Sequence, residues 1–248
     1  MQNPSASMLV IGDEILSGRT RDSNMHYLAI ELTKVGIDLK EVRVISDLEV
    51  EIVQAVTQLS EKYDYVFTSG GIGPTHDDIT ALSISKAFKV KYAFNTEAYS
   101  ILEKYYGKTN FNEGRKKMAK MPSGSVLIYN PSSAAPGFKI KNVLCLPGVP
   151  SILKSMINNL KKFLIKGTVV LSKSINILSV ESNISKELDT IQNKFLKKVE
   201  IGSYPFFRLG KVGVSLVLRS TSIKQINLCK NVINKILKKK KIKLFKNS

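Results

Sequence analysis

Short apolar runs alternate with longer amphipathic runs over the first two thirds of the chain. The expected strands lie at residues 6–11, 37–45, 65–69, 126–128, 137–140 and 142–146. The expected helices lie at residues 23–35, 49–62, 79–88, 95–106, 112–120 and 150–164, and residues 12–22 are expected to form a polar loop. This alternation is typical of a layered α/β fold. The run at residues 65–69 is apolar, which predicts a strand covered on both faces.

The pattern changes near residues 166–168, which we interpret as a domain boundary. Beyond it, strands are expected at 169–178, 199–204 and 212–220, and helices at 184–196 and 223–238. This order favours a small α+β domain. The predicted organisation is an α/β domain over residues 1–166, followed by an α+β domain over residues 167–248 with a basic C-terminal tail.

A glycine-rich segment, residues 69–78, joins the strand expected at 65–69 to the following helix. Its glycines are Gly70, Gly71 and Gly73, and its hydroxyl side chains include Ser69 and Thr75. Glycines at a strand-to-helix turn let backbone amides approach a phosphate closely. Asp77 and Asp78 follow at the helix entrance, where carboxylates can hold a divalent cation against that phosphate. The segment therefore predicts a phosphorylated ligand, and a metal such as Mg²⁺, Mn²⁺ or Co²⁺.

Two further loops are expected at the same edge of the sheet, because ligands of open α/β sheets bind at the carboxyl ends of strands. The candidate residues are Asp13, Glu14, Asp22 and Asn24 in the first loop, and Pro147 and Gly148 in the second. Asp13 and Glu14 are candidates for a general base or a metal ligand, and Asp22, Asn24 and the Pro147–Gly148 turn for contacts with a nucleotide. Arg19 or Arg21 can balance phosphate charge. Convergence of the three loops predicts one polar, anion-binding cleft.

Each of these residue types also has an ordinary structural role. Asp77 or Asp78 can cap a helix without binding a metal. Asp13 and Glu14 can be solvated loop residues, and Asn24, with the preceding serine, can cap the first long helix. The glycines and the Pro147–Gly148 pair can serve only to turn the chain. The residue pattern leaves these alternatives open.

Composition restricts the class of protein further. Of the 248 residues, 43% are hydrophobic, which is enough for a substantial core. The formal charge of +18 suits polyanionic partners, but the basic residues are mostly lysines without interleaved aromatic residues, so nucleic acid is not an expected partner. Cys145 and Cys229 belong to no metal-spacing motif. No run reaches the roughly 20 apolar residues of a membrane span, and no signal peptide is recognised, so we expect a cytoplasmic protein without a membrane partner.

The chain carries several ordered motifs, which are Gly12-Asp13-Glu14, Asp22-Ser23-Asn24, the segment 70–80, Ala135-Pro136-Gly137-Phe138 and Leu146-Pro147-Gly148-Val149-Pro150. Together they resemble the molybdopterin-binding (MoaB/Mog-like) domain family, in particular the version at the N-terminus of the competence/damage-inducible protein CinA. The resemblance covers residues 7–165 and extends more weakly into the second domain. It implies a three-layer α/β/α domain with a mostly parallel mixed sheet, and a homo-oligomer, either a dimer or a trimer.

The resemblance also implies a choice of activities. Domains of the CinA type are associated with metal-dependent hydrolysis of dinucleotide pyrophosphates such as ADP-ribose, and a related domain of eukaryotic FAD synthases with FAD hydrolysis. In this family Asp78 matches the metal-associated aspartate, with Asp77 beside it. The leading hypothesis is therefore a divalent-metal-dependent nucleotide pyrophosphatase that releases AMP. The alternatives are binding or adenylylation of a molybdopterin, whose ligand is a pterin phosphate, and a non-catalytic binding module.

Two positions depart from the family pattern. Ile152 stands where the family usually carries a glutamate, and Ser133 begins the pair that replaces a usual Gly-Thr. If that glutamate organises the site, its loss weakens catalysis or changes the substrate.

Overall fold

The structure is a computed structural model and describes residues 3–245. The chain divides into two compact units, residues 1–167 and residues 168–248. Within the described residues, no helix combines the length and the apolar character that a membrane span requires.

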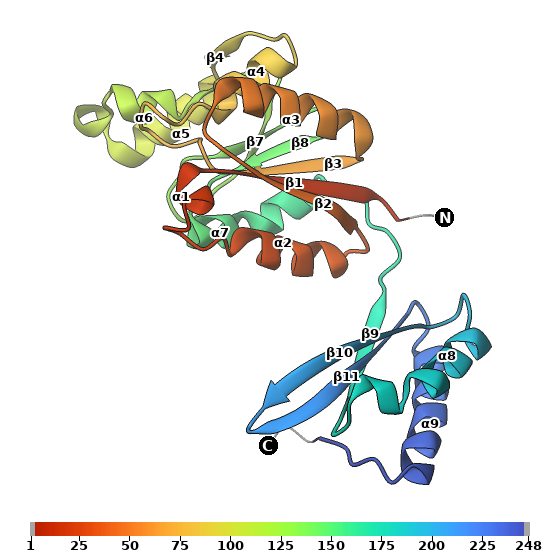
Figure 1. The fold of residues 1–248 in the computed structure, drawn as a ribbon. Coiled ribbons are helices and arrows are strands. Elements are labelled where there is room, and N and C mark those ends of the chain that lie inside the picture. Colours follow the sequence, from red (N-terminus) through yellow and green to blue (C-terminus); the bar gives the residue numbers. More distant parts are fainter. Residues whose placement is uncertain (1–2, 246–248) are drawn as a thin grey trace. The chain divides into compact units, whose positions relative to one another are not determined.

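The N-terminal unit is built on a six-stranded sheet in the order β2-β1-β3-β8-β7-β6 (Figure 1). Its strands are β1 (Ser5–Ile11), β2 (Asp38–Ile45), β3 (Tyr65–Ser69), β6 (Val126–Ile128), β7 (Gly137–Ile140) and β8 (Val143–Leu146). The pairs β1–β2, β1–β3 and β3–β8 are parallel, and β7 and β6 continue the sheet in antiparallel fashion. The sheet is therefore mixed and mostly parallel, as expected.

Helices cover both faces of this sheet, with α3 and α4 on one side and α2 and α7 on the other (Figure 1). The helices of the unit are α1 (Asp13–Leu16), α2 (Asn24–Thr33), α3 (Glu49–Lys62), α4 (Thr80–Ala87), α5 (Thr96–Tyr106), α6 (Glu113–Lys117) and α7 (Pro150–Lys161), with a 3₁₀ turn, η1, at Lys108–Asn110. The three-layer α/β/α prediction is confirmed.

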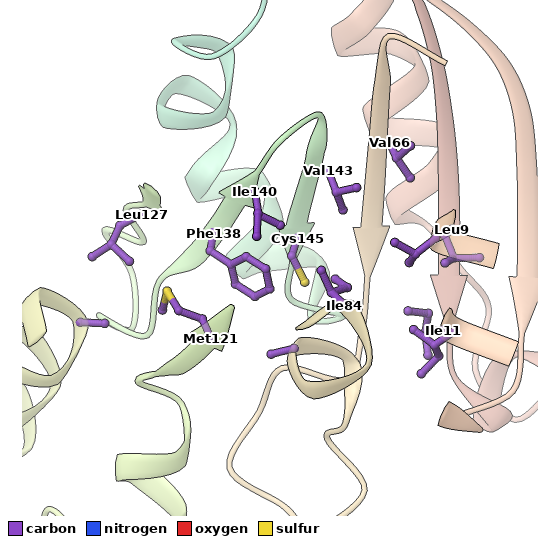
Figure 2. Packing of buried hydrophobic residues seen from close by; sticks show 14 of the residues in the cluster. Leu9, Ile11, Val66, Ile84, Met121, Leu127, Phe138, Ile140, Val143 and Cys145 are labelled. Atoms are coloured by element: carbon purple, nitrogen blue, oxygen red, sulfur yellow. The ribbon is translucent and has the colours of Figure 1, made fainter. Parts of the chain in front are cut away.

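Two hydrophobic clusters, one on each face of the sheet, hold the layers together. Alternate residues of β1 serve opposite clusters: Leu9 and Ile11 belong to the cluster shown in Figure 2, and Met8 and Val10 to the other. This follows from the two-residue period of a strand, whose successive side chains point to opposite faces. All five residues of β3 are buried, including the polar Thr68 and Ser69, because both faces of this central strand are covered.

Some expected elements differ from the observed ones. The loop expected at residues 12–22 contains the short helix α1, and the helix expected at 112–120 ends at Lys117. Residues Lys120–Pro122 instead form β5, which pairs antiparallel with β4 (Tyr92–Phe94). Strands this short leave no readable periodicity in the sequence, so their pairing became visible only in the fold.

The C-terminal unit has a three-stranded antiparallel sheet in the order β10-β11-β9. Its elements are β9 (Leu171–Ile177), a 3₁₀ turn η2 (Glu181–Asn183), α8 (Ser185–Lys194), β10 (Glu200–Arg208), β11 (Lys211–Ser220) and α9 (Ile223–Lys239). Buried residues of the sheet and of both helices, among them Leu216, Ile191 and Ile226, form its own core. The expected α+β character of this part of the chain is confirmed.

Candidate functional site

A cleft of about 730 Å³ lies in the N-terminal unit, where the loops after β1, β3 and β8 meet. Eight of the candidate residues line it, namely Glu14, Gly70, Gly71, Gly73, Asp77, Asp78, Pro147 and Gly148. The loops converge because their strands are parallel neighbours, so their carboxyl ends lie at one edge of the sheet. The cleft is within the size range of small-molecule sites.

The glycine loop after β3 has a backbone that only glycine accommodates. Gly70 has a φ of 112°, and a Cβ atom there would lie 2.2 Å from the carbonyl oxygen of Ile11. Gly71 has a φ of 67°, and its Cβ would lie 2.1 Å from the Thr80 hydroxyl. Thr80, the first residue of α4, closes the loop by donating its amide to the carbonyl of Gly71 at 3.0 Å.

Only part of the expected phosphate cradle is available. The Gly70 amide donates to the carbonyl of Leu146 at 3.1 Å, so it ties β3 to β8 and cannot also receive a phosphate. The amides of Gly71 and Gly73 have no recorded acceptor among residues 3–245, and both residues line the cleft. The Gly70 amide therefore positions the loop, and the predicted phosphate contacts of the glycine amides rest on Gly71 and Gly73.

Asp78 has both a structural contact and access to the cleft. Its Oδ2 atom accepts hydrogen bonds from the Thr75 amide at 2.8 Å and from the Thr75 hydroxyl at 2.5 Å. The carboxylate also lies against Gly73, since a Cβ at that glycine would be 2.6 Å from Asp78 Oδ2. Thr75 does not line the cleft, and its hydroxyl proton is used by Asp78. Thr75 thus forms a turn that holds Asp78, and its contact with a phosphate stays a prediction.

The charges that line the cleft are mostly negative. Its carboxylates are Glu14, Asp47, Asp77 and Asp78, and Arg115 is the single cation among the described lining residues. Asp47 was not among the residues expected from the sequence, although it follows β2 just as the other candidates follow their strands. Burial raises the pKa of the Asp47 carboxyl. The hydrogen bond that it accepts from the Asp13 amide, at 3.0 Å, lowers this pKa, and the charges of Asp13, Glu14 and Asp77 raise it.

The donor atoms of the cleft suit a hard divalent cation that is shared with a ligand. Carboxylate oxygens are the preferred ligands of Mg²⁺ and Mn²⁺, and Mg²⁺ is often held by one or two carboxylates together with phosphates of the substrate. Among residues 3–245, no three or more histidine, cysteine, aspartate or glutamate side chains converge closely enough to hold an ion by themselves. The residues thus fit a cation that would arrive with a phosphate and that Asp77 and Asp78 could hold, rather than a closed protein cage.

Asn24 lies behind the cleft and joins two of its loops. The side chain is only 3% exposed, and its Nδ2 atom donates to the Ser69 hydroxyl at 2.8 Å and to the Gly148 carbonyl at 2.7 Å. Ser69 is buried as well, and its hydroxyl lies 3.5 Å from the Pro147 carbonyl. Neither Asn24 nor Ser69 lines the cleft, and their hydrogen bonds form a clamp that fixes the glycine loop against the Pro147–Gly148 turn. Their contact with a ligand stays a prediction.

The remaining candidates in the first loop have structural contacts. Asp22 accepts hydrogen bonds from the amides of Asn24 at 3.3 Å and Met25 at 2.9 Å, and so caps α2, where Ser23 makes no side-chain cap. Asp13 does not line the cleft, and its amide is bound to Asp47. Asp22 thus caps α2 and lies outside the lining of the cleft, and its contact with a nucleotide stays a prediction. Arg19, Arg21 and His76 also lie outside the lining of the cleft.

The clamp yields a prediction about loop order. Asn24→Ala removes two hydrogen bonds, one buried and one partly buried, so we expect a loss of about 2 kcal/mol in the free energy of unfolding. We also expect faster hydrogen exchange in residues 69–75 and 147–150, measured by mass spectrometry. Asn142→Ala is a matched control, because Asn142 Nδ2 donates to the carbonyls of Ser60 at 2.9 Å and Tyr63 at 2.8 Å, away from the cleft. If residues 69–75 and 147–150 exchange hydrogen at the same rate in Asn24→Ala as in Asn142→Ala, the clamp is contradicted.

The fold and the cleft define a three-layer α/β protein with a cleft of small-molecule size at the carboxyl edge of its sheet. Residues 7–166 match the family described as "Probable molybdopterin binding domain", and residues 169–246 match "FAD synthase, middle domain". The chain therefore belongs to the molybdopterin-binding domain family, and the expectation of a MoaB/Mog-like domain is confirmed.

Individual relatives agree with this assignment. A "Probable FAD synthase" from Caenorhabditis elegans is 34% identical over 229 residues, which cover 82% of this chain and 44% of the relative. A protein from Archaeoglobus fulgidus is 33% identical, over 80% of this chain and 84% of its own length. The crystal structure of CinA from Thermoplasma acidophilum, described as of unknown function, matches with a TM-score of 0.62 and 33% identity, over 66% of this chain and 100% of its own. The chain spans about half the length of the FAD synthase relatives.

The two departures from the family pattern lie in the cleft itself. Ile152 lines it with an apolar side chain, and Ser133 lines it while accepting a hydrogen bond on its hydroxyl from Asn130 Nδ2 at 2.7 Å. The cleft thus lacks a carboxylate at position 152, but Asp47 supplies one from a different loop.

Proposed function

We propose that the cleft binds a dinucleotide pyrophosphate and hydrolyses it in the presence of a divalent cation. The proposed substrate is FAD, with ADP-ribose as a related substrate. Water adds to one phosphorus atom as the bridging P–O bond breaks, so FAD and water give FMN and AMP with no other reactant.

The charge of the cleft is the observation that carries this proposal. The glycine amides that could donate to a phosphate lie among four carboxylates and one guanidinium, so a pyrophosphate entering alone would meet net repulsion. Asp77 and Asp78 would hold a divalent cation in this cleft, and its charge would offset that repulsion. When bound, the cation would neutralise phosphate charge and lower the barrier to attack by water.

The residues of the chain have distinct parts in this proposal. Asp77 and Asp78 would hold the cation, and the amides of Gly71 and Gly73 would donate hydrogen bonds that orient the phosphate oxygens. Asn24, Ser69 and Gly70 keep the loops in place. Glu14 is the favoured general base, because it lines the cleft and Asp13 does not.

The matched families guide the choice of substrate. The FAD synthase match of residues 169–246 and the names of the worm relatives favour a flavin dinucleotide over ADP-ribose. The same names favour a second candidate, transfer of an adenylyl group to FMN, and the family description of residues 7–166 favours a pterin phosphate as ligand.

The proposal also includes the location and the assembly of the protein, which are a cytoplasmic homo-oligomer, either a dimer or a trimer.

The test is a product assay with the full chain. We expect FMN and AMP from FAD when Mg²⁺, Mn²⁺ or Co²⁺ is added, and no turnover with excess chelator. Parallel assays replace FAD with other substrates. These are ADP-ribose, FMN together with ATP, and FMN together with ATP and added pyrophosphatase. Formation of FAD from FMN and ATP without FAD hydrolysis would favour the transferase. A fluorescent pterin that co-purifies with an inactive protein would favour the pterin ligand.

A further inference from the structure

One wall of the cleft is aromatic and basic, unlike the rest of its lining. Tyr106, at the end of α5, and Arg115, in α6, both line the cleft. The guanidinium carbon of Arg115 lies 4.2 Å from the centroid of the Tyr106 ring, within the range of a cation–π contact. Tyr105 packs edge-on against Tyr106, with ring centroids 5.0 Å apart. The result is a cation–π pair that lines the same cleft as the glycine loop.

The structure holds this pair in position relative to the phosphate cradle. Asn112 caps α6 by accepting the Arg115 amide at 3.0 Å, and an Nη atom of Arg115 donates to the carbonyl of Asn110. Lys117 of α6 donates to the carbonyl of Thr75 in the glycine loop. Gly114 approaches the same loop, since a Cβ there would be 3.1 Å from the Pro74 carbonyl oxygen. The pair and the cradle are thus parts of one packed region.

The charge of Arg115 is not used by a carboxylate. No ion pair of this guanidinium occurs among residues 3–245, and its only recorded side-chain hydrogen bond goes to the Asn110 carbonyl. A planar guanidinium stacked on a tyrosine can receive a second planar group on its other face or beside the ring. Lysine cannot do this, because its ammonium group has no plane.

We propose that Tyr106 and Arg115 form the stacking wall for a planar ring of the dinucleotide. This inference rests on the proposed function and adds the recognition of the ring. The ring is either the isoalloxazine of a flavin or the adenine of AMP, and both present an aromatic face. The wall lies on the α5–α6 segment beside the glycine loop, so one ligand can stack there while its phosphates reach Gly71 and Gly73.

The test measures binding of the two product fragments rather than turnover. FMN binding to the full chain is followed by quenching of flavin fluorescence, and AMP binding by calorimetry, each with Mg²⁺. Stacking of a base on an aromatic side chain contributes about 1–3 kcal/mol. We therefore expect Tyr106→Leu to raise the Kd of one fragment about tenfold or more, and Tyr106→Phe to leave it within about twofold. Arg115→Lys keeps the positive charge but is expected to weaken binding of the same fragment, because lysine has no planar group.

Tyr129→Leu is the matched control, because Tyr129 is exposed in the same unit and does not line the cleft. The fragment whose binding Tyr106→Leu weakens, FMN or AMP, identifies the ring that stacks on Tyr106. Unchanged Kd values for both fragments in Tyr106→Leu, or no binding of either fragment to the wild type, would overturn the stacking wall. If Tyr106→Leu leaves fragment binding unchanged and the protein still hydrolyses FAD, the stacking wall is overturned and the proposed function stands. If FMN binding depends on Tyr106 but FAD is not hydrolysed, the result supports the stacking wall and counts against the pyrophosphatase.

Discussion

Gly70→Ala is expected to lower the free energy of unfolding of the N-terminal unit by about 3 kcal/mol. Two costs add at this position. The φ of 112° is unfavourable for any residue with a side chain, and the new Cβ would meet the backbone oxygen of Ile11 at 2.2 Å. Because that oxygen belongs to β1, relief of the clash requires movement of the central strands. Urea unfolding of the full chain, followed by circular dichroism, measures the loss.

The matched control separates backbone conformation from steric conflict. Gly124 also has a positive φ, 85°, but nothing lies within 4 Å of the position its Cβ would take. Gly124→Ala is expected to cost only the conformational term, about 1 kcal/mol. Equal losses for the two variants would show that the contact with Ile11 does not constrain the glycine loop.

Asp78→Asn is expected to reduce the proposed FAD hydrolysis by about 10²- to 10³-fold, with little loss of stability. The substitution keeps a side-chain oxygen that can accept the hydrogen bonds of Thr75, so the turn is preserved. It removes the negative charge that would hold the cation. The kcat/KM for FAD, measured over a range of Mg²⁺ or Mn²⁺ concentrations, together with the melting temperature, checks both parts of this prediction.

Asp64→Asn is a close structural control for this variant. Asp64 Oδ2 accepts hydrogen bonds from the amide and the hydroxyl of Ser5, both at 2.7 Å, which is the arrangement that Asp78 makes with Thr75. Asp64 does not line the cleft, so Asp64→Asn is expected to leave hydrolysis unchanged. An active Asp78→Asn enzyme with unaltered metal dependence would reduce Asp78 to the capping role that the sequence alone left open.

The sequence by itself determined the layered fold and the location of the cleft. The two-residue period of β1, the apolar run of β3 and the helical period of α3 specify which residues are buried, because burial of apolar surface dominates folding. Parallel strands then bring their carboxyl ends together, so the loops that carry Glu14, Asp78 and Gly148 meet in one cleft. These relations depend on local patterns and on general rules of chain topology.

The tertiary structure alone decided which atoms are free to bind. The Gly70 amide, the Thr75 hydroxyl and the Asn24 amide group have partners within the protein, and the sequence does not reveal them. Asp47 reaches the cleft from the loop after β2, and Arg115 stacks on Tyr106 across the turn between α5 and α6. Such pairings depend on the packing of segments that are distant or irregular in sequence. A residue's type fixes what it can bind, but its neighbours in the fold decide whether it is available.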